Sequence, residues 1–327
     1  MTETRGRLLR AVTRLGGAVF GVLALCCLTA PTLAGAFPEK PIQMVVPYKP
    51  GGGNDISARI VSDHLKGILS QPVVITNIDG AAGGLGAMSV IKAHPDGYTL
   101  LWEHPTVGPL INKANYSWRS FDPVCVIAAS PLALIVRGDS PFKTAAEALA
   151  AIKAEPGKYR WPMALNGITQ FIYFYINDLM DLSPHIYPQY SDKGRITDLM
   201  GNNADIALVA YSAAVPYQKS GDIRILAVMS EMRLEFAPEI PTLKEQGIDA
   251  VYEMRYAVFA TKGTPPDVIK TLSGAFKKVL ADPATQKALR EQFFVPLYRD
   301  APETVKLWAE EEAKNIQVGK KHGLIKE

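Results

Sequence analysis

The sequence of 327 residues has few of the groups that bind metals or carry out catalysis. It contains three cysteines and five histidines, and none stands in a Cys-x-x-Cys or in a histidine pair four residues apart. It also lacks a Gly-x-Ser-x-Gly turn, a Gly-Lys-Ser/Thr phosphate loop and the glycine spacing of a dinucleotide fingerprint. We therefore expect no metal, no cofactor and no catalytic residues.

A net charge is missing as well, once residues 1–36 are set aside. Removing the four arginines and one glutamate of that segment from 35 basic and 32 acidic residues leaves 31 of each. A neutral body offers no general electrostatic attraction for nucleic acid or for an anionic membrane. We expect neither as a partner.

Residues 1–36 have the anatomy of a secretory signal peptide. Four arginines precede the apolar run Gly16–Leu28, which is shorter than the ~20 residues that span a bilayer as a helix. The run leads to Ala34-Gly35-Ala36, a small-x-small cleavage site before Phe37. We expect a periplasmic protein. An uncleaved anchor, or lipid attachment at Cys26 or Cys27, is the alternative.

The rest of the chain alternates between short apolar segments and segments with helical periodicity. Candidate helices follow Asp55, Thr144 and Thr264, and the last spans Pro302–Val318. The candidate strands are Ile42–Pro47, Val73–Asn77, Tyr98–Trp102, Val124–Ser130, Ala133–Arg137, Ile206–Ala210, Ile225–Ser230 and Tyr256–Thr261. This alternation predicts an α/β fold with mainly parallel sheets.

Two glycine-rich turns, Val46–Asp55 and Asn77–Ala87, each lie between a candidate strand and a helix, and Ala164–Gln170 forms a third turn. Glycine lets the backbone approach a ligand closely, and a helix start offers unpaired N–H groups. Together they form an anion site that needs no lysine or arginine. The alternative is that Asn54 or Asp55 only caps a helix and the glycines only turn the chain.

These motifs, in their order, resemble the tripartite tricarboxylate transporter receptors, also called the Bug family. The resemblance covers essentially the whole chain after residue 36. It is carried by Pro50–Asp55, Pro95–Leu101, Asn166-Gly167, Thr197–Leu199, Arg224–Val228, Pro241-Thr242 and Gly263–Pro265. No single motif is decisive, but the ordered set is specific.

The resemblance implies a periplasmic binding protein-like fold of type II, with two α/β lobes joined by crossing strands around a ligand cleft. The first lobe would comprise 37–137 and 251–327, and the second 138–250. Such a receptor captures a small organic carboxylate, as a monomer, and delivers it to a membrane permease. A ligand-binding partner of a sensor kinase and a periplasmic enzyme on the same fold are the alternatives.

The resemblance also implies a set of ligand-binding residues. His104 and Arg255 are added from their own chemistry, and Tyr211 as the residue that follows Val209-Ala210. The positions that match the family's ligand loops are Tyr48, Gly53, Asn54, Asp55, Ala81, Ala82, Gly83, Gly84, Asn166, Gly167, Thr169, Gln170, Tyr190 and Ser191. Arg255 could grip a carboxylate through two parallel hydrogen bonds or simply pair with Glu253.

Several positions depart from the family pattern. Trp102-Glu103-His104 stands where members often have small or hydroxyl residues, Phe171 replaces a common histidine, and Val209-Ala210 replaces an Asp-Asn pair. These changes favour a more apolar or aromatic ligand, unless the side chains point into the core. Glu103 would repel an acid, so an amino or hydroxyl group on the ligand becomes plausible if Glu103 faces the cleft.

Overall fold

The computed structural model describes residues 37–104, 108–111 and 114–325. Every element below belongs to the unit Lys40–Glu327. The signal peptide expected at residues 1–36 lies outside the described residues. In the part of the chain that is described, no helix combines the length and the apolar character needed to cross a membrane.

The secondary structure alternates largely as the sequence predicts. The strands are β1 (Ile42–Val46), β2 (Val73–Asn77), β3 (Thr99–Glu103), β4 (Phe121–Arg137), β5 (Arg160–Met163), β6 (His185–Pro188), β7 (Ala207–Ala210), β8 (Ile223–Val228), β9 (Glu253–Thr261) and β10 (Val295–Arg299). The α-helices are α2 (Gly53–His64), α3 (Gly84–Ile91), α4 (Gly108–Ile111), α5 (Ala145–Ala154), α6 (Ile168–Met180), α7 (Asp192–Met200), α8 (Tyr211–Ser220), α9 (Pro266–Ala281), α10 (Pro283–Glu291) and α11 (Ala301–Lys321). Short 3₁₀ turns lie at η1 (Ala81–Gly83), η2 (Trp118–Ser120) and η3 (Lys244–Gln246).

The main sheet is mixed, so the prediction of mainly parallel sheets is wrong. Its strands run in the order β10-β4-β9-β3-β1-β2. β1 is parallel to β2 and β3, whereas β9, β4 and β10 join the sheet antiparallel to their neighbours. A strand that is covered on both faces has the same apolar composition in either direction. The apolar runs therefore revealed the strands but not their direction.

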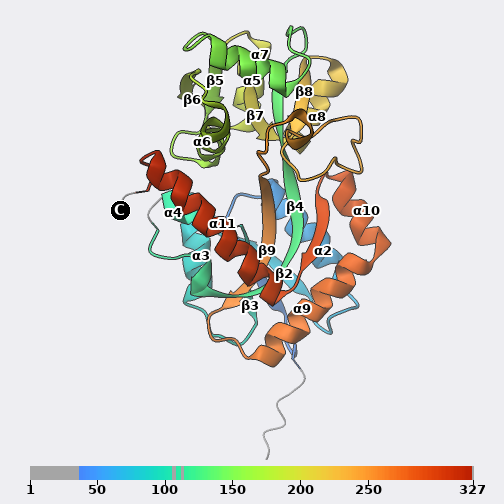
Figure 1. Cartoon of the computed structure of the whole chain (residues 1–327). Coiled ribbons are helices and arrows are strands. Elements are labelled where there is room, and N and C mark those ends of the chain that lie inside the picture. The colour runs from blue at the N-terminus through green and yellow to red at the C-terminus, as the bar shows by residue number, and fades with distance from the viewer. Residues whose placement is uncertain (1–36, 105–107, 112–113, 326–327) are drawn as a thin grey trace, which may run out of the picture. The chain divides into compact units, whose positions relative to one another are not determined.

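One long strand, β4, belongs to both lobes of the fold (Figure 1). Phe121–Pro131 pairs with β9, and Leu132–Arg137 pairs with β7 and β8. The two strands predicted at Val124–Ser130 and Ala133–Arg137 are thus a single one. Pro131 lies where β4 exchanges one set of partners for the other, a position that tolerates a residue without an N–H donor.

Two lobes are joined by β4 and β9. The first lobe contains β1–β3 and β10, and the second contains β5–β8. In the first lobe, α3 and α11 cover one face of the sheet, where Ala87 and Trp308 pack with Val45, Leu101 and Phe259. Helix α2 and its neighbour α10 lie on the other side (Figure 1). The lobe limits predicted at residues 137/138 and 250/251 stay a prediction.

The C-terminal helix α11 also contributes to the second lobe. Val318 packs in the same core cluster as Phe171 and Ile176 of α6. Lys321 and His322 both pair with Asp178 of α6, at 2.6 and 2.8 Å. The helix therefore links the lobes at a second place, away from β4 and β9.

Candidate functional site

The first glycine-rich turn connects β1 to α2 and is held in place by Asp55. Its carboxylate, 3% exposed, accepts hydrogen bonds from the backbone N–H of Gly51 at 2.9 Å, from Arg59 Nε at 3.0 Å and from Asn77 Nδ2 at 2.9 Å. Burial raises the pKa of this carboxyl, but the hydrogen bonds more than offset that effect and hold the pKa below its usual value. Asp55 therefore ties the turn to the end of β2.

Helix α2 begins at Gly53 at a point where no side chain fits. A Cβ atom there would lie 2.9 Å from the hydroxyl oxygen of Tyr256. The N-cap residue is Gly52, and no side chain caps the helix. The interpretation of Asn54 or Asp55 as a helix cap is therefore wrong, and the N–H groups of the first turn are left without a side-chain acceptor. Asn54 Oδ1 is also buried without a hydrogen-bond partner among the described residues.

The second glycine-rich turn runs from β2 into α3 through four consecutive residues with positive φ. Gly80 and Gly83 have φ angles of 136° and 93°, and Ala81 and Ala82 between them have 49° and 52°. The left-handed conformation costs a non-glycine residue roughly 1–2 kcal/mol. The carbonyl of Gly80 accepts the N–H groups of Gly83 and Leu85, at 3.1 and 3.3 Å. The turn is thus fixed by its own hydrogen bonds, and strain of this kind concentrates at binding sites.

The two turns meet at Tyr48 and Gly83. A Cβ atom on Gly83 would lie 3.2 Å from the Tyr48 hydroxyl oxygen and 3.1 Å from Glu103 Oε2. The Tyr48 hydroxyl donates to Glu103 Oε1 at 3.2 Å. We call Tyr48, Gly53, Gly83, Glu103 and Tyr256 the turn cluster. It lies beyond the carboxyl ends of β1, β2 and β3, the edge at which open α/β sheets bind their ligands.

Glu103 is the buried acid of the turn cluster. Glu103 is only 4% exposed, and its side chain forms no ion pair with any residue that the structure describes. Burial raises its pKa to about 7, although hydrogen bonds from the His104 N–H, at 2.7 Å, and from Tyr48 act in the opposite direction. Burial also lowers the pKa of His104 to about 4, so this histidine is neutral at physiological pH.

Tyr256 lies at the centre of the turn cluster, on β9. Its ring contacts those of His104 and Phe294, with centroids 6.1 and 5.9 Å apart, and its hydroxyl lies near Ser130 of β4. Burial raises the pKa of Tyr256, and the charges of Glu103 and Asp192 raise it further. Asp192 belongs to the start of α7, so a carboxylate of the second lobe also raises the pKa of the Tyr256 hydroxyl group.

The third predicted turn uses its polar side chains to hold itself together. Asn166 has φ 54°, and its N–H donates to Gln170 Oε1 at 2.7 Å. Thr169 Oγ1 accepts the N–H of Ala164 at 2.8 Å. Gly167 is the N-cap of α6 and offers no side chain. Phe171, whose orientation was open, packs in the core of the second lobe.

The other second-lobe residues of the predicted site lie at the starts of α7 and α8. Tyr190 is 70% exposed, and Ser191 caps α7 by accepting the N–H of Gly194 at 3.1 Å. Tyr211 packs with Phe236 and Phe293, each with ring centroids 5.7 Å apart. Phe293 directly precedes the Phe294 that contacts Tyr256, so Tyr211 approaches the turn cluster from the second lobe.

Arg255 is not brought together with the glycine-rich turns. It pairs with Glu253, at 2.9 Å, and with Glu311 of α11. Successive residues of a strand point to opposite faces, and Tyr256, its neighbour, belongs to the turn cluster. Burial raises the pKa of Glu311 to about 7, although Arg255 lowers it.

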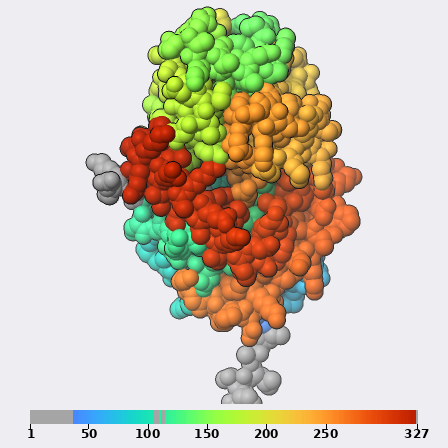
Figure 2. Space-filling view, in the orientation of Figure 1, coloured from blue at the N-terminus to red at the C-terminus, as the bar shows by residue number. Residues whose placement is uncertain are grey.

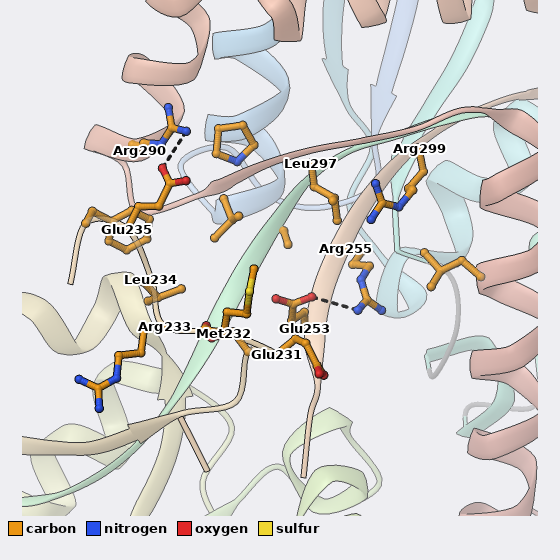
Figure 3. A pocket seen from close by; sticks show the side chains of 16 residues that line it. Glu231, Met232, Arg233, Leu234, Glu235, Glu253, Arg255, Arg290, Leu297 and Arg299 are labelled. Atoms are coloured by element: carbon orange, nitrogen blue, oxygen red, sulfur yellow. Dashed lines mark hydrogen bonds and ion pairs between the residues drawn. The ribbon is translucent and has the colours of Figure 1, made fainter. Parts of the chain in front are cut away.

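A cavity of about 420 Å³ lies on the Arg255 face of β9 (Figure 3). Figure 2 shows this face hollowed between α11, in red, and the orange segment of the second lobe. Among the predicted site residues, Arg255 lines it and the others do not. The Arg290–Glu235 ion pair, at 2.9 Å, lines it and joins the first lobe to the second. The lining residues are Ala129, Ser230, Glu231, Met232, Arg233, Leu234, Glu235, Phe236, Glu253, Arg255, Arg290, Val295, Pro296, Leu297, Arg299 and Leu307.

The structure therefore gathers part of the predicted site and adds residues to it. Tyr48, Gly53, Gly83 and His104 come together. The side chains of Thr169, Gln170 and Ser191 are occupied within their own turns, and that of Asp55 by Gly51, Arg59 and Asn77. Sequence reasoning did not select Tyr256, Ser130 or Asp192, and it left the orientation of Glu103 open. The alternation of β9 offered a signal for Tyr256, because Arg255 and Tyr256 cannot share a face.

The fold and the converging strand-to-helix turns define a two-lobed periplasmic binding protein. Residues 57–324 match the model of the family described as the tripartite tricarboxylate transporter family receptor. The chain belongs to this family of solute-binding receptors, which serve transporters and are not enzymes.

Relatives and solved structures agree with this assignment. BugT of Bordetella pertussis is 29% identical over 304 residues, which is 90% of this chain and 92% of BugT. The crystal structure of a TctC solute-binding protein from Polaromonas is 27% identical and has a TM-score of 0.77, covering 87% of this chain and 99% of its own. A Rhodopseudomonas palustris protein solved with adipate shares the fold, with 24% identity, a TM-score of 0.75 and coverage of 88% and 98%.

Proposed function

We propose that this receptor binds a small organic carboxylate at the turn cluster and delivers it to a tripartite tricarboxylate-type permease. The candidate ligands are di- and tricarboxylates and aromatic carboxylates. The turns at Asn166–Gln170 and Tyr190-Ser191, with Tyr211, close on it from the second lobe. The observation that carries the proposal is the meeting of two strand-to-helix turns at Tyr48 and Gly83. The protein acts in the periplasm as a monomer, with lobes at 37–137 plus 251–327 and at 138–250.

The carboxylate is held mainly by backbone groups. The start of α2 carries about half a positive charge and N–H donors without a side-chain cap. Micromolar affinity corresponds to about −8 kcal/mol, and a charge-assisted hydrogen bond contributes roughly 1.5–3 kcal/mol. Five or six such bonds from the two lobes leave a surplus over the cost of ordering the lobes around the ligand. The R. palustris neighbour with adipate supports a linear acid among the first probes.

Calorimetry on Gly53→Ala tests the location of the site. A thermal-shift screen over aliphatic, hydroxy and aromatic carboxylates first identifies a ligand, because a compound that binds only the folded state raises the melting temperature. The added Cβ lies 2.9 Å from the Tyr256 hydroxyl oxygen, so the start of α2 must move. We expect at least a tenfold loss of affinity.

Gly274→Ala is the matched control, since a Cβ at Gly274 meets no atom within 4 Å. Unchanged affinity in a folded Gly53→Ala variant contradicts the proposed location. Delivery is tested by uptake of the ligand in cells that carry a tripartite permease, with and without this receptor. Receptor-independent uptake, combined with receptor-dependent activation of a sensor kinase, would favour the sensor-partner function instead.

A further inference from the structure

Glu103 places a carboxylate inside a site that otherwise suits an anion. It ends β3 and lies between the two glycine-rich turns, next to Tyr48 and Gly83. Glu103 is 4% exposed, and no lysine, arginine or histidine of the described residues forms an ion pair with its carboxylate. A buried acid without a cation is unfavourable, and the protein gains nothing in packing that a glutamine would not provide.

The two oxygens of Glu103 have different surroundings. Oε1 accepts the backbone N–H of His104 at 2.7 Å and the hydroxyl of Tyr48 at 3.2 Å. Oε2 faces Gly83, 3.1 Å from where a Cβ would stand, and receives no donor from the residues that the structure describes. A side chain at Gly83 would crowd this oxygen, because its Cβ would also lie 3.2 Å from the Tyr48 hydroxyl oxygen.

A second carboxylate on the ligand would place a negative charge next to the negatively charged Glu103 Oε2. Like charges at close range in a low-dielectric site repel strongly, so one of the two acids would have to take up a proton. An ammonium or hydroxyl group instead supplies a donor to Oε2, which receives none from the described residues. A site built to hydrogen-bond one polar group rejects analogues without it far more strongly than a hydrophobic pocket does.

We propose that Glu103 makes the turn cluster select a carboxylate ligand whose other end carries a hydrogen-bond donor, an amino or a hydroxyl group, in place of a second carboxylate. The ligand's single carboxylate is held at the start of α2, and its donor group binds Glu103 Oε2. This inference rests on the proposed function, because it assumes that the ligand occupies the turn cluster.

Matched ligand series test the inference on the wild-type protein by calorimetry at pH 8. Each series keeps the skeleton and changes only the distal group. The compounds are butanoate, succinate, 4-hydroxybutanoate and 4-aminobutanoate; hexanoate, adipate, 6-hydroxyhexanoate and 6-aminohexanoate; and benzoate, terephthalate, 4-hydroxybenzoate and 4-(aminomethyl)benzoate. In the series that binds, we expect the amino or hydroxy acid to bind at least tenfold more tightly than the diacid.

Glu103→Gln links the selectivity to the residue, because the amide keeps the acceptor for the His104 N–H and adds a donor toward the ligand. We expect the preference for the amino acid over the diacid to fall at least tenfold. Glu311→Gln is the matched control, since it removes a half-buried acid of α11 on the Arg255 face of β9, and the ligand preference of this variant should equal that of the wild type. If Glu103→Gln does not fold, the wild-type series still decide.

The pH dependence gives an independent readout. The titratable groups that face Glu103 are Tyr48, Tyr116, Tyr256 and His104, and Asp192 faces Tyr256 from the second lobe. The tyrosine pKa values are raised by burial and that of His104 is lowered, so Glu103 is the one of these facing groups that titrates between pH 6 and pH 8. Diacid affinity should fall over this range, while ω-amino acid affinity should not.

The outcomes separate this inference from the proposed function. A diacid that binds as tightly as its amino and hydroxy analogues overturns the inference and leaves carboxylate binding intact. An unaltered preference in folded Glu103→Gln also overturns it. Failure of every compound to bind below 1 mM counts against the proposed function itself, and the inference falls with it.

Discussion

Replacing Glu103 by glutamine should stabilise the unliganded protein, but only at neutral and higher pH. Burial raises the pKa of this carboxyl from 4.5 to about 7, and each pKa unit corresponds to 1.36 kcal/mol, so the ionised form costs up to about 3 kcal/mol. Between these two values the folded protein keeps a proton that the unfolded chain releases, so stability falls as the pH rises. Above pH 7 the whole cost is present, and glutamine removes it.

The assay is thermal unfolding of the wild type and Glu103→Gln at pH 5 and pH 8, without ligand. For a protein of this size, about 3 kcal/mol corresponds to about 5 °C in melting temperature. The variant should melt close to the wild type at pH 5 and above it at pH 8. The hydrogen bonds to Oε1 are retained in the glutamine variant, so their loss does not obscure the difference.

His104 affects both proteins in the same way. Its pKa in the folded state is lowered to about 4, so it contributes stability at high pH that is lost as the pH falls from about 6.5 toward 4. The readout is therefore the difference between variant and wild type at each pH. An equal difference at pH 5 and pH 8, or a less stable variant at pH 8, would refute the reasoning that burial makes ionised Glu103 costly.

Three further substitutions test the framework around the turn cluster. Asp55→Ala removes the acceptor of three donors and should lower the free energy of unfolding, measured in urea, by about 2–3 kcal/mol; a loss below 0.5 kcal/mol would mean that Asp55 does not tie the turn to β2. Arg255→Ala removes the guanidinium that pairs with Glu253 and Glu311 and should destabilise the protein by about 3 kcal/mol at pH 8, while ligand affinity in calorimetry changes less than twofold; a tenfold loss of affinity would place Arg255 in the site. Gly86→Ala puts a Cβ 2.6 Å from that of Pro47 and should lower stability by about 1–3 kcal/mol, whereas an unchanged melting curve would show that α3 can move away from the first turn.

Much of the fold could be predicted because local patterns were strong. The capping box of Thr144 and Glu147 is present at the start of α5, and β2 has the predicted limits. Strands with weak patterns were missed. β10 contains Pro296 and β6 is largely exposed, so neither shows the continuous apolar run that reveals a buried strand. Helix α9 begins at Pro266, one residue later than predicted.

The candidate site was predictable only at the level of the backbone. Glycine-rich turns between strands and helices are visible in the sequence, and the structure brings two of them together at Tyr48 and Gly83. Side-chain roles were harder to predict, because they depend on which face of a strand a residue occupies. Arg255 was selected for its chemistry, but the register of β9 turns Tyr256 toward the turns instead.

The sharing of β4 between the lobes limits how this protein can be divided. A fragment that stops at residue 130 would lack β9, the strand between β3 and β4, and one that starts there would deprive β9 and β10 of most of the β4 residues with which they pair. Neither half is a self-sufficient folding unit, so truncation should yield aggregation-prone chains with open sheet edges. A reporter domain inserted to make a biosensor is therefore better placed in an exposed loop than at the lobe boundary.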